Sequence, residues 1–192
     1  MQNNINNVSF QANLKPLTKI QNKIAFTKAK ELFTNATKNY PNDSVYINRN
    51  TLGETIINLS NDRTNSLYSW KEIGTKNIDK QIEEMGADKF AEKLIKMFKA
   101  LKLQEKASAK IASMNSELIR LTKVMEINKN AAHNWKLEGK DSIANRYNVL
   151  VQNNKGRINQ IKSAQQEYKN EYNQKIEDLS KQYKEIIQLK IK

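Results

Sequence analysis

The chain has 192 residues, of which 38% are hydrophobic and 7% aromatic, with two prolines, five glycines and no cysteine. This length fits one ordinary domain, or a small domain with an elongated appendage. The composition excludes disulfides, a thiolate nucleophile and cysteine-ligated zinc, and no window approaches the roughly 20 apolar residues that span a bilayer.

The formal net charge of +13 is typical of proteins that bind nucleic acid or an anionic membrane surface. The excess is spread evenly, because residues 1–75, 76–139 and 140–192 carry 9, 13 and 11 basic residues against 5, 9 and 6 acidic ones. Only five of the 33 basic residues are arginine, the better reader of bases and phosphates. A coding bias towards Lys, Asn and Ile explains the excess without a partner.

The first seven residues are polar and lack the basic start and apolar stretch of a Sec signal peptide. We therefore expect a soluble, cytoplasmic protein, although secretion without a Sec signal also fits. Apolar and polar residues then alternate from Val8 to Ala12, which predicts a short strand ending before Pro16. A helix is predicted over about residues 17–39, with Pro16 at its start. Its apolar face is assigned to Ile20, Ile24, Leu32, Phe33 and Ala36.

Residues 44–73 allow more than one interpretation. The segment Ser44–Asn48 has the alternating, β-branched character of a strand. Residues 51–60 fit either a helix that begins at a Thr51–Glu54 capping box or a second strand. A further short strand is expected over Leu67–Trp70. We predict that residues 1–75 form a small α+β cap with two or three strands.

From Asn77 the sequence predicts nearly continuous helix, with a break or kink near Gly86. Two apolar series follow the spacing of a helix–helix seam. Between them, residues 104–109 are small and polar, so the seam changes phase there by a three-residue offset. The first series is Phe90, Leu94, Met97 and Leu101, and the second is Ile111, Met114, Leu118, Leu121 and Met125.

A turn is predicted at residues 138–142, where Gly139 suits the end of one helix and Asp141 or Ser142 the start of the next. The two arms, residues 88–135 and 142–190, have nearly equal length. The fold class is therefore mainly α, with a long antiparallel helical hairpin over residues 76–192. The second arm carries one apolar stripe: Ile143, Tyr147, Leu150, Ile158, Ile161, Tyr168, Tyr172, Ile176, Leu179, Tyr183 and Ile187.

No residue pattern indicates catalysis. His133 is the only histidine, and its sequence neighbours offer neither an orienting group nor a second metal ligand. The isolated glycines lack the companions of a phosphate-binding loop. We predict that the protein is not an enzyme and that it has no cofactor, metal or small-molecule substrate.

Two residue sets are candidates for binding. Trp135 near the turn and the tyrosines 168, 172 and 183 could anchor a partner, although packing in the seam explains the Tyr168, Tyr172 and Tyr183 spacing more simply. Lys155, Arg157 and Lys162 are the candidate phosphate contacts. The hypothesis is a non-enzymatic interaction or structural protein that docks or spaces protein partners, or self-associates. The alternative is an electrostatic nucleic-acid-binding protein with weak sequence specificity, and no membrane insertion is expected.

Overall fold

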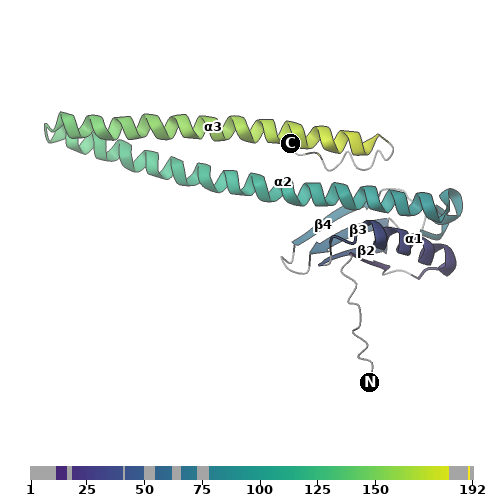
Figure 1. Ribbon diagram of the computed structural model, residues 1–192. Coiled ribbons are helices and arrows are strands. Elements are labelled where there is room, and N and C mark those ends of the chain that lie inside the picture. Colours follow the sequence, from purple (N-terminus) through teal and green to yellow (C-terminus); the bar gives the residue numbers. More distant parts are fainter. Residues whose placement is uncertain are drawn as a thin grey trace, which may run out of the picture. The chain divides into compact units, whose positions relative to one another are not determined.

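The computed structural model describes residues 12–16, 19–40, 42–49, 55–61, 66–72, 78–181 and 190. It confirms a mainly α protein in which a small N-terminal α+β cap precedes a long helical hairpin (Figure 1). The elements, in chain order, are β1 (Asn13–Pro16), α1 (Lys23–Ala36), β2 (Asp43–Arg49), β3 (Thr55–Asn61), β4 (Ser66–Glu72), α2 (Ile78–Leu137) and α3 (Asp141–Ser180).

The strands form one sheet in the order β1-β2-β3-β4. Strand β1 is parallel to β2, with Leu14 opposite Val45, and the remaining pairs are antiparallel. The sheet thus has four strands where two or three were predicted, and residues 55–61 are strand rather than helix. Pro16 ends β1, an edge strand, where a residue without a backbone N–H is tolerated.

The start of α1 differs from the prediction. The helix begins at Lys23 rather than near residue 17, and Pro16 belongs to β1. Asn22 caps α1 by accepting a hydrogen bond from the backbone N–H of Ala25. The Asp79 carboxylate, in the first turn of α2, accepts hydrogen bonds from the backbone of Gln21 and Asn22. A residue far away in the sequence therefore fixes where α1 starts. The strand predicted before it lies outside the described residues except for Ala12, which precedes β1.

The buried face of α1 also differs from the predicted one. Phe26, Ala29 and Phe33 are buried at helical spacing, whereas Ile24 is 88% exposed. The Phe33 ring packs edge to face with the Phe98 ring of α2, with 5.6 Å between the ring centroids. Of the predicted face, Phe33 is buried as expected, whereas Ile24, Leu32 and Ala36 are exposed.

The N-terminal part of α2 packs in the same compact unit as the cap. The rings of Tyr40 and Phe98 pack edge to face, with 5.1 Å between their centroids. Lys102 Nζ forms a 2.9 Å ion pair with Asp43 Oδ2 on β2. The predicted kink is present at Gly86, whose φ of 79° and ψ of 159° interrupt the helical geometry. The predicted first series of α2 is buried in this unit: Phe90, Leu94, Met97 and Leu101.

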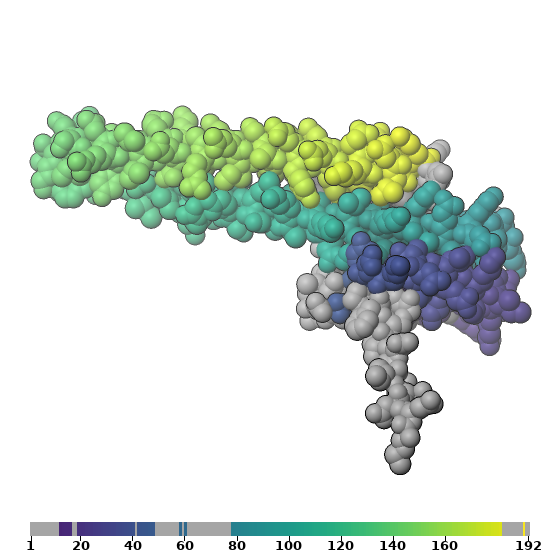
Figure 2. Space-filling model, viewed as in Figure 1, coloured from purple at the N-terminus to yellow at the C-terminus, as the bar shows by residue number. Residues whose placement is uncertain are grey.

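A second compact unit comprises residues 104–176 with Lys190. Within it α3 runs back along α2 from the turn, and the two helices meet closely at the turn end in the space-filling view (Figures 1 and 2). Buried and half-buried positions recur every three or four residues on both helices. The seam positions among them are residues 104, 107, 111, 114, 118, 121, 125, 128, 132 and 135 on α2, and residues 144, 147, 151, 154, 158, 161, 165, 168 and 172 on α3.

The seam corrects one residue of the apolar stripe predicted on α3 and agrees with the phase shift predicted on α2. Val151 is buried, whereas Leu150, which was assigned to the stripe, is 46% exposed. In the predicted phase shift, Leu101, Gln104 and Ala107 follow one another at two successive three-residue steps. The α3 stripe beyond residue 181 lies outside the described residues.

Candidate interaction surface

The hairpin turn consists of Glu138, Gly139 and Lys140. Gly139 has a φ of 73°, and its N–H and that of Lys140 donate to the carbonyls of Lys136 and Trp135. This is the Schellman arrangement that ends a helix through a left-handed glycine. The carbonyl of Lys140, rather than the predicted Asp141 or Ser142, accepts the first hydrogen bonds of α3.

Trp135 is half-buried at this turn. The ammonium group of Lys140 lies 4.5 Å from the centre of its ring and is also 2.9 Å from a carboxylate oxygen of Glu138. The indole therefore has a cation–π partner within the turn itself. Trp135 closes the end of the hairpin, and part of its ring surface is used by Lys140.

The burial of the tyrosines of α3 favours a packing role over a role as partner anchors. Tyr172 is only 3% exposed, and burial, together with the nearby Tyr168, raises the pKa of its phenol to about 12. Tyr168 is half-buried at the preceding seam position, and Tyr183 lies outside the described residues. Tyr172 and Tyr168 are thus components of the helix–helix seam.

The three candidate phosphate contacts are exposed but do not lie together. Lys155 and Lys162 are seven residues apart, which places them on one side of α3. Arg157 is two residues from Lys155 and therefore points to the opposite side. There its guanidinium lies 3.4 Å from a carboxylate oxygen of Glu117 on α2.

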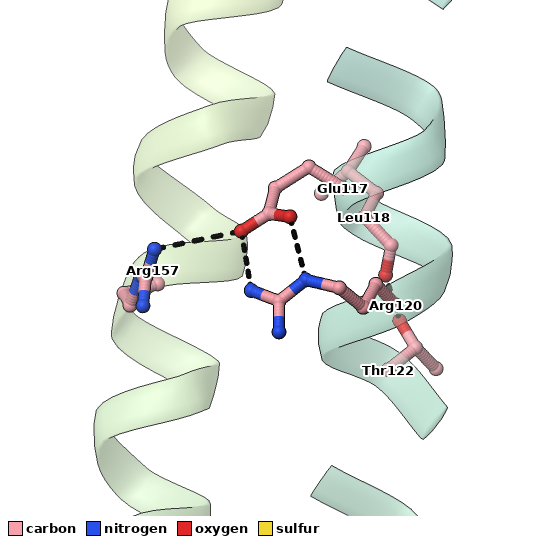
Figure 3. A network of polar contacts seen from close by, with 5 residues as sticks. All are labelled: Glu117, Leu118, Arg120, Thr122 and Arg157. Atoms are coloured by element: carbon pink, nitrogen blue, oxygen red, sulfur yellow. Dashed lines mark hydrogen bonds and ion pairs between the residues drawn. The ribbon is translucent and has the colours of Figure 1, made fainter. Parts of the chain in front are cut away.

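Glu117 is the centre of a charged network on that side of the hairpin (Figure 3). Its carboxylate accepts hydrogen bonds of 2.7 and 2.8 Å from Arg120, one turn along α2, and faces Arg157 of α3. The hydrogen bonds from Arg120 lower the pKa of the Glu117 carboxyl below its ordinary value, and the charge of Arg157 adds to this effect. The same contact raises the pKa of Arg120.

These contacts distinguish the two flanks of the hairpin. The Glu117–Arg157 pair marks one flank, and a 2.8 Å hydrogen bond from Gln165 to Asn115 marks the other. Residues three, four or seven positions away in a helix share a face. Several lysines follow that spacing on the flank marked by Asn115 and Gln165: Lys129, Lys136, Lys155, Lys162 and Lys169.

The flank of Glu117 and Arg157 continues towards the turn as an apolar patch, defined here as Val124, Ile127 and Leu150. Each member lies seven residues from a member of the charged network, because Val124 follows Glu117, Ile127 follows Arg120 and Leu150 precedes Arg157 by that interval. Ile127 is 65% exposed and Leu150 46% exposed. The patch therefore occupies the same flank, about 10 Å closer to the turn.

Sequence reasoning missed this patch, although the sequence contains a signal for it. Ile127 falls outside the series of seam positions on α2, and a β-branched aliphatic residue has no packing role on a solvated helix face. Leu150 lies between Val149 and Val151, so periodicity alone does not identify the seam residue.

Three of the five arginines surround the patch. On α2, Arg120, Val124 and Ile127 follow i, i+4 and i+7 spacing, and on α3 Arg146 precedes Leu150 by four residues. Arg157 completes the set, and Glu117, the carboxylate of the network, is already bound to Arg120. Three guanidinium groups against one carboxylate leave a net charge of +2 on the network and Arg146 together.

Other kinds of site are not found in the part of the chain that the structure describes. No group of three or more His, Asp or Glu side chains is placed to hold a metal ion there, and His133 is exposed. Shallow hollows lie on α1, one of about 380 Å³ beside Ile24 and Lys28, lined by side chains of that one helix. No described helix combines the length and the apolar character needed to cross a bilayer.

Protein-family models, curated proteins and solved structures were all compared with this chain, and none matches it. A functional proposal for the chain therefore rests on its own residues, and the apolar patch with its three arginines is the surface that carries one.

Proposed function

We propose that this protein is a non-enzymatic interaction protein whose helical hairpin docks a protein partner. The observation that carries the proposal is the exposure of Ile127 and Leu150, two large aliphatic side chains on one flank of the hairpin. Exposed apolar residues that cluster and are rimmed by polar groups are typical of protein–protein contact sites. The arginines beside them add to this, because arginine is enriched among residues that contribute most to binding.

The rest of the hairpin fits a scaffold for such a contact. A seam of buried residues fixes α3 against α2, and the ends of both helices are defined at the turn by backbone hydrogen bonds. Surface residues on rigid helices present a constant geometry to a partner, which reduces the entropy lost on binding.

Site-directed photo-crosslinking tests the proposal in cells of the source organism. A photoreactive amino acid would replace Ile119, Ile127 or Leu137, which are exposed on the hairpin, and Ile24, which is exposed on α1. We expect one defined protein to be crosslinked from at least one hairpin position and not from Ile24. Crosslinks from Ile24 alone, or from none of the four positions, would contradict a docking role for the hairpin.

Nucleic-acid binding is the second candidate, and the lysines of the flank marked by Asn115 and Gln165 favour it. Lys155 and Lys162 are spaced seven residues apart on α3, and Lys129 and Lys136 have the same spacing on α2. Lysines in rows contact phosphates without reading sequence. A gel shift with duplex RNA distinguishes the candidates, because this binding should weaken steeply as salt rises and should be lost in a Lys155→Gln/Lys162→Gln variant. If the RNA is not shifted at about 50 mM salt, nucleic-acid binding is excluded as the function.

A further inference from the structure

We infer that the apolar patch of Val124, Ile127 and Leu150, with Arg120, Arg146 and Arg157 around it, is the docking surface for an acidic amphipathic helix of a partner protein. This inference rests on the proposed docking function and assigns it a surface and a class of partner. It depends on three features of the flank: its geometry, its charge and the aliphatic nature of its apolar residues.

The geometry matches a helix as the occupant. Leu150 lies 11 residues after Gly139 and Ile127 12 residues before it, so the two side chains lie at the same level on neighbouring helices. Val124 lies one turn further from the hairpin end. They place three apolar side chains, the half-buried Val124 and the exposed Ile127 and Leu150, within about one helical turn along the same flank. An amphipathic helix binds such a surface through residues at i, i+3, i+4 and i+7.

The charge favours carboxylates in the partner. Arg146 lies on the turn side of the patch, and Arg120 and Arg157 lie on the other side. The side chains of Arg120 and Arg157 remain more than half exposed although both contact Glu117. An arginine fork binds carboxylates in a bidentate manner, which lysine does not. A partner helix with Asp or Glu at both ends of its apolar stripe would pair with these arginines.

Two other occupants fit the flank less well. Single-stranded nucleic acid binds through aromatic side chains on which bases stack, and the patch is aliphatic. A second copy of the chain, related by a two-fold axis in the interface, would place Arg146 against either Arg146 or the Arg120 and Arg157 pair. Both arrangements bring positive groups together, and like charges opposed across an interface disfavour association.

A peptide-binding experiment with the full chain tests the inference. The probe is a synthetic helical peptide of about five turns, with Leu at i, i+3 and i+7 and Glu at both ends of this stripe. A second peptide carries Lys in place of every Glu. Binding to the wild type and to the Ile127→Ser, Leu150→Ser and Arg146→Gln variants is measured by calorimetry. Ile119→Ser is the matched control, because Ile119 is 58% exposed on α2 and lies outside the patch.

We expect the acidic peptide to bind and the Lys peptide to bind at least about tenfold more weakly. Ile127→Ser and Leu150→Ser should each weaken binding by about tenfold, and Ile119→Ser should leave it unchanged. All three positions are exposed, so these variants should keep the wild-type melting curve. Equal binding of both peptides, or an equal loss with Ile119→Ser, would overturn the inference.

Failure of the inference is distinguishable from failure of the proposed function. If neither peptide binds, or if the acidic peptide binds without sensitivity to Ile127→Ser, the patch is not the surface inferred, whereas crosslinking from another hairpin position would still support docking. If sedimentation shows a dimer that Ile127→Ser dissociates, a second copy covers the patch and the inference is wrong. The absence of crosslinks from every hairpin position removes both proposals.

Discussion

Asp43 at the start of β2 and Lys102 on α2 form an ion pair of 2.9 Å in which both side chains are largely buried. Lys102 also lies over the ring of Tyr40, at 5.6 Å from its centre. The carboxylate and the ammonium are each removed from water, and their pairing offsets part of the cost of burying them. The pair therefore joins the sheet to the helix within the N-terminal unit.

Loss of one charge of this pair should be costly. We expect Asp43→Asn to lower the free energy of unfolding by about 3 kcal/mol, because Lys102 is then a buried charge without its carboxylate. The Asp43→Asn/Lys102→Met double variant should regain most of this loss. The control is Asp88→Asn, which breaks the exposed 2.7 Å Lys28–Asp88 pair and should change stability by about 1 kcal/mol or less. Urea denaturation measures all three, and equal effects of Asp43→Asn and Asp88→Asn would contradict the role of burial.

Three glycines, two with a positive φ and one within α3, should respond differently to replacement by alanine. Gly86 has a φ of 79° and a ψ of 159°, a region that side chains rarely enter, so Gly86→Ala should destabilise by about 2 kcal/mol. Gly139, with a φ of 73°, lies in the left-handed region, and Gly139→Ala should cost about 1 kcal/mol.

Gly156 provides the opposite case. It lies within α3, and an added Cβ would meet no atom within 4 Å, as at Gly86 and Gly139. Gly156→Ala should therefore stabilise the protein by about 1 kcal/mol through helix propensity alone. Thermal melts of the Gly86→Ala, Gly139→Ala and Gly156→Ala variants rank their stabilities. A destabilised Gly156→Ala variant would show that the α3 surface is in contact with another group at this position.

The hairpin was predictable because its information is local and periodic. Seam residues such as Leu121 and Ile158 recur at heptad spacing, and Gly139 provides the turn. The exact seam residue was not predictable within Val149–Val151, where three consecutive apolar residues satisfy the pattern equally. Only the register against α2 selects Val151 and leaves Leu150 exposed.

The cap was less predictable because its boundaries depend on distant residues. Pro16 is a good first residue of a helix, yet it belongs to β1, which pairs with β2. Asp79 holds the backbone of Gln21 and Asn22, and so defines the start of α1 from 57 and 58 positions away. Helical geometry alone places Lys155 and Arg157 on two different flanks of the hairpin. The pairing of Arg157 with Glu117 could not be predicted in the same way, because Glu117 lies on the other helix, 40 residues away in the sequence.

The pKa of Glu117 should depend more on Arg120 than on Arg157. Because hydrogen bonds from Arg120 are the main cause of its lowered pKa, Arg120→Gln should raise the pKa of Glu117 more than Arg157→Gln does. Titration of the Glu117 side-chain carbon signal by NMR measures both shifts. A carboxyl whose pKa is depressed in the folded state contributes stability above its unfolded pKa, and this contribution is lost as pH falls through the folded pKa. An equal shift in both variants would indicate that Arg157 contacts Glu117 as closely as Arg120 does.

Burial of Tyr172 should make the protein sensitive to high pH. Its phenol has a pKa of about 12 in the folded chain, against about 10 in an unfolded chain. Between these values the unfolded state releases the proton that the folded state keeps, so stability falls as pH rises. The decrease is about 1.4 kcal/mol per pH unit, or on the order of 2–3 kcal/mol over the whole interval.

Comparison with Tyr172→Phe isolates this effect, because deprotonation of lysines is common to both proteins. The stability of the wild type relative to Tyr172→Phe should fall by that amount between about pH 10 and pH 12. Tyr168→Phe, which removes a half-buried neighbour and keeps Tyr172, should still show the decrease. Urea denaturation across this range measures the free energy of unfolding, and the absorbance of phenolate measures the ionisation of the tyrosines. A constant difference between wild type and Tyr172→Phe would mean that Tyr172 ionises at its ordinary pKa, which a side chain buried in the seam should not do.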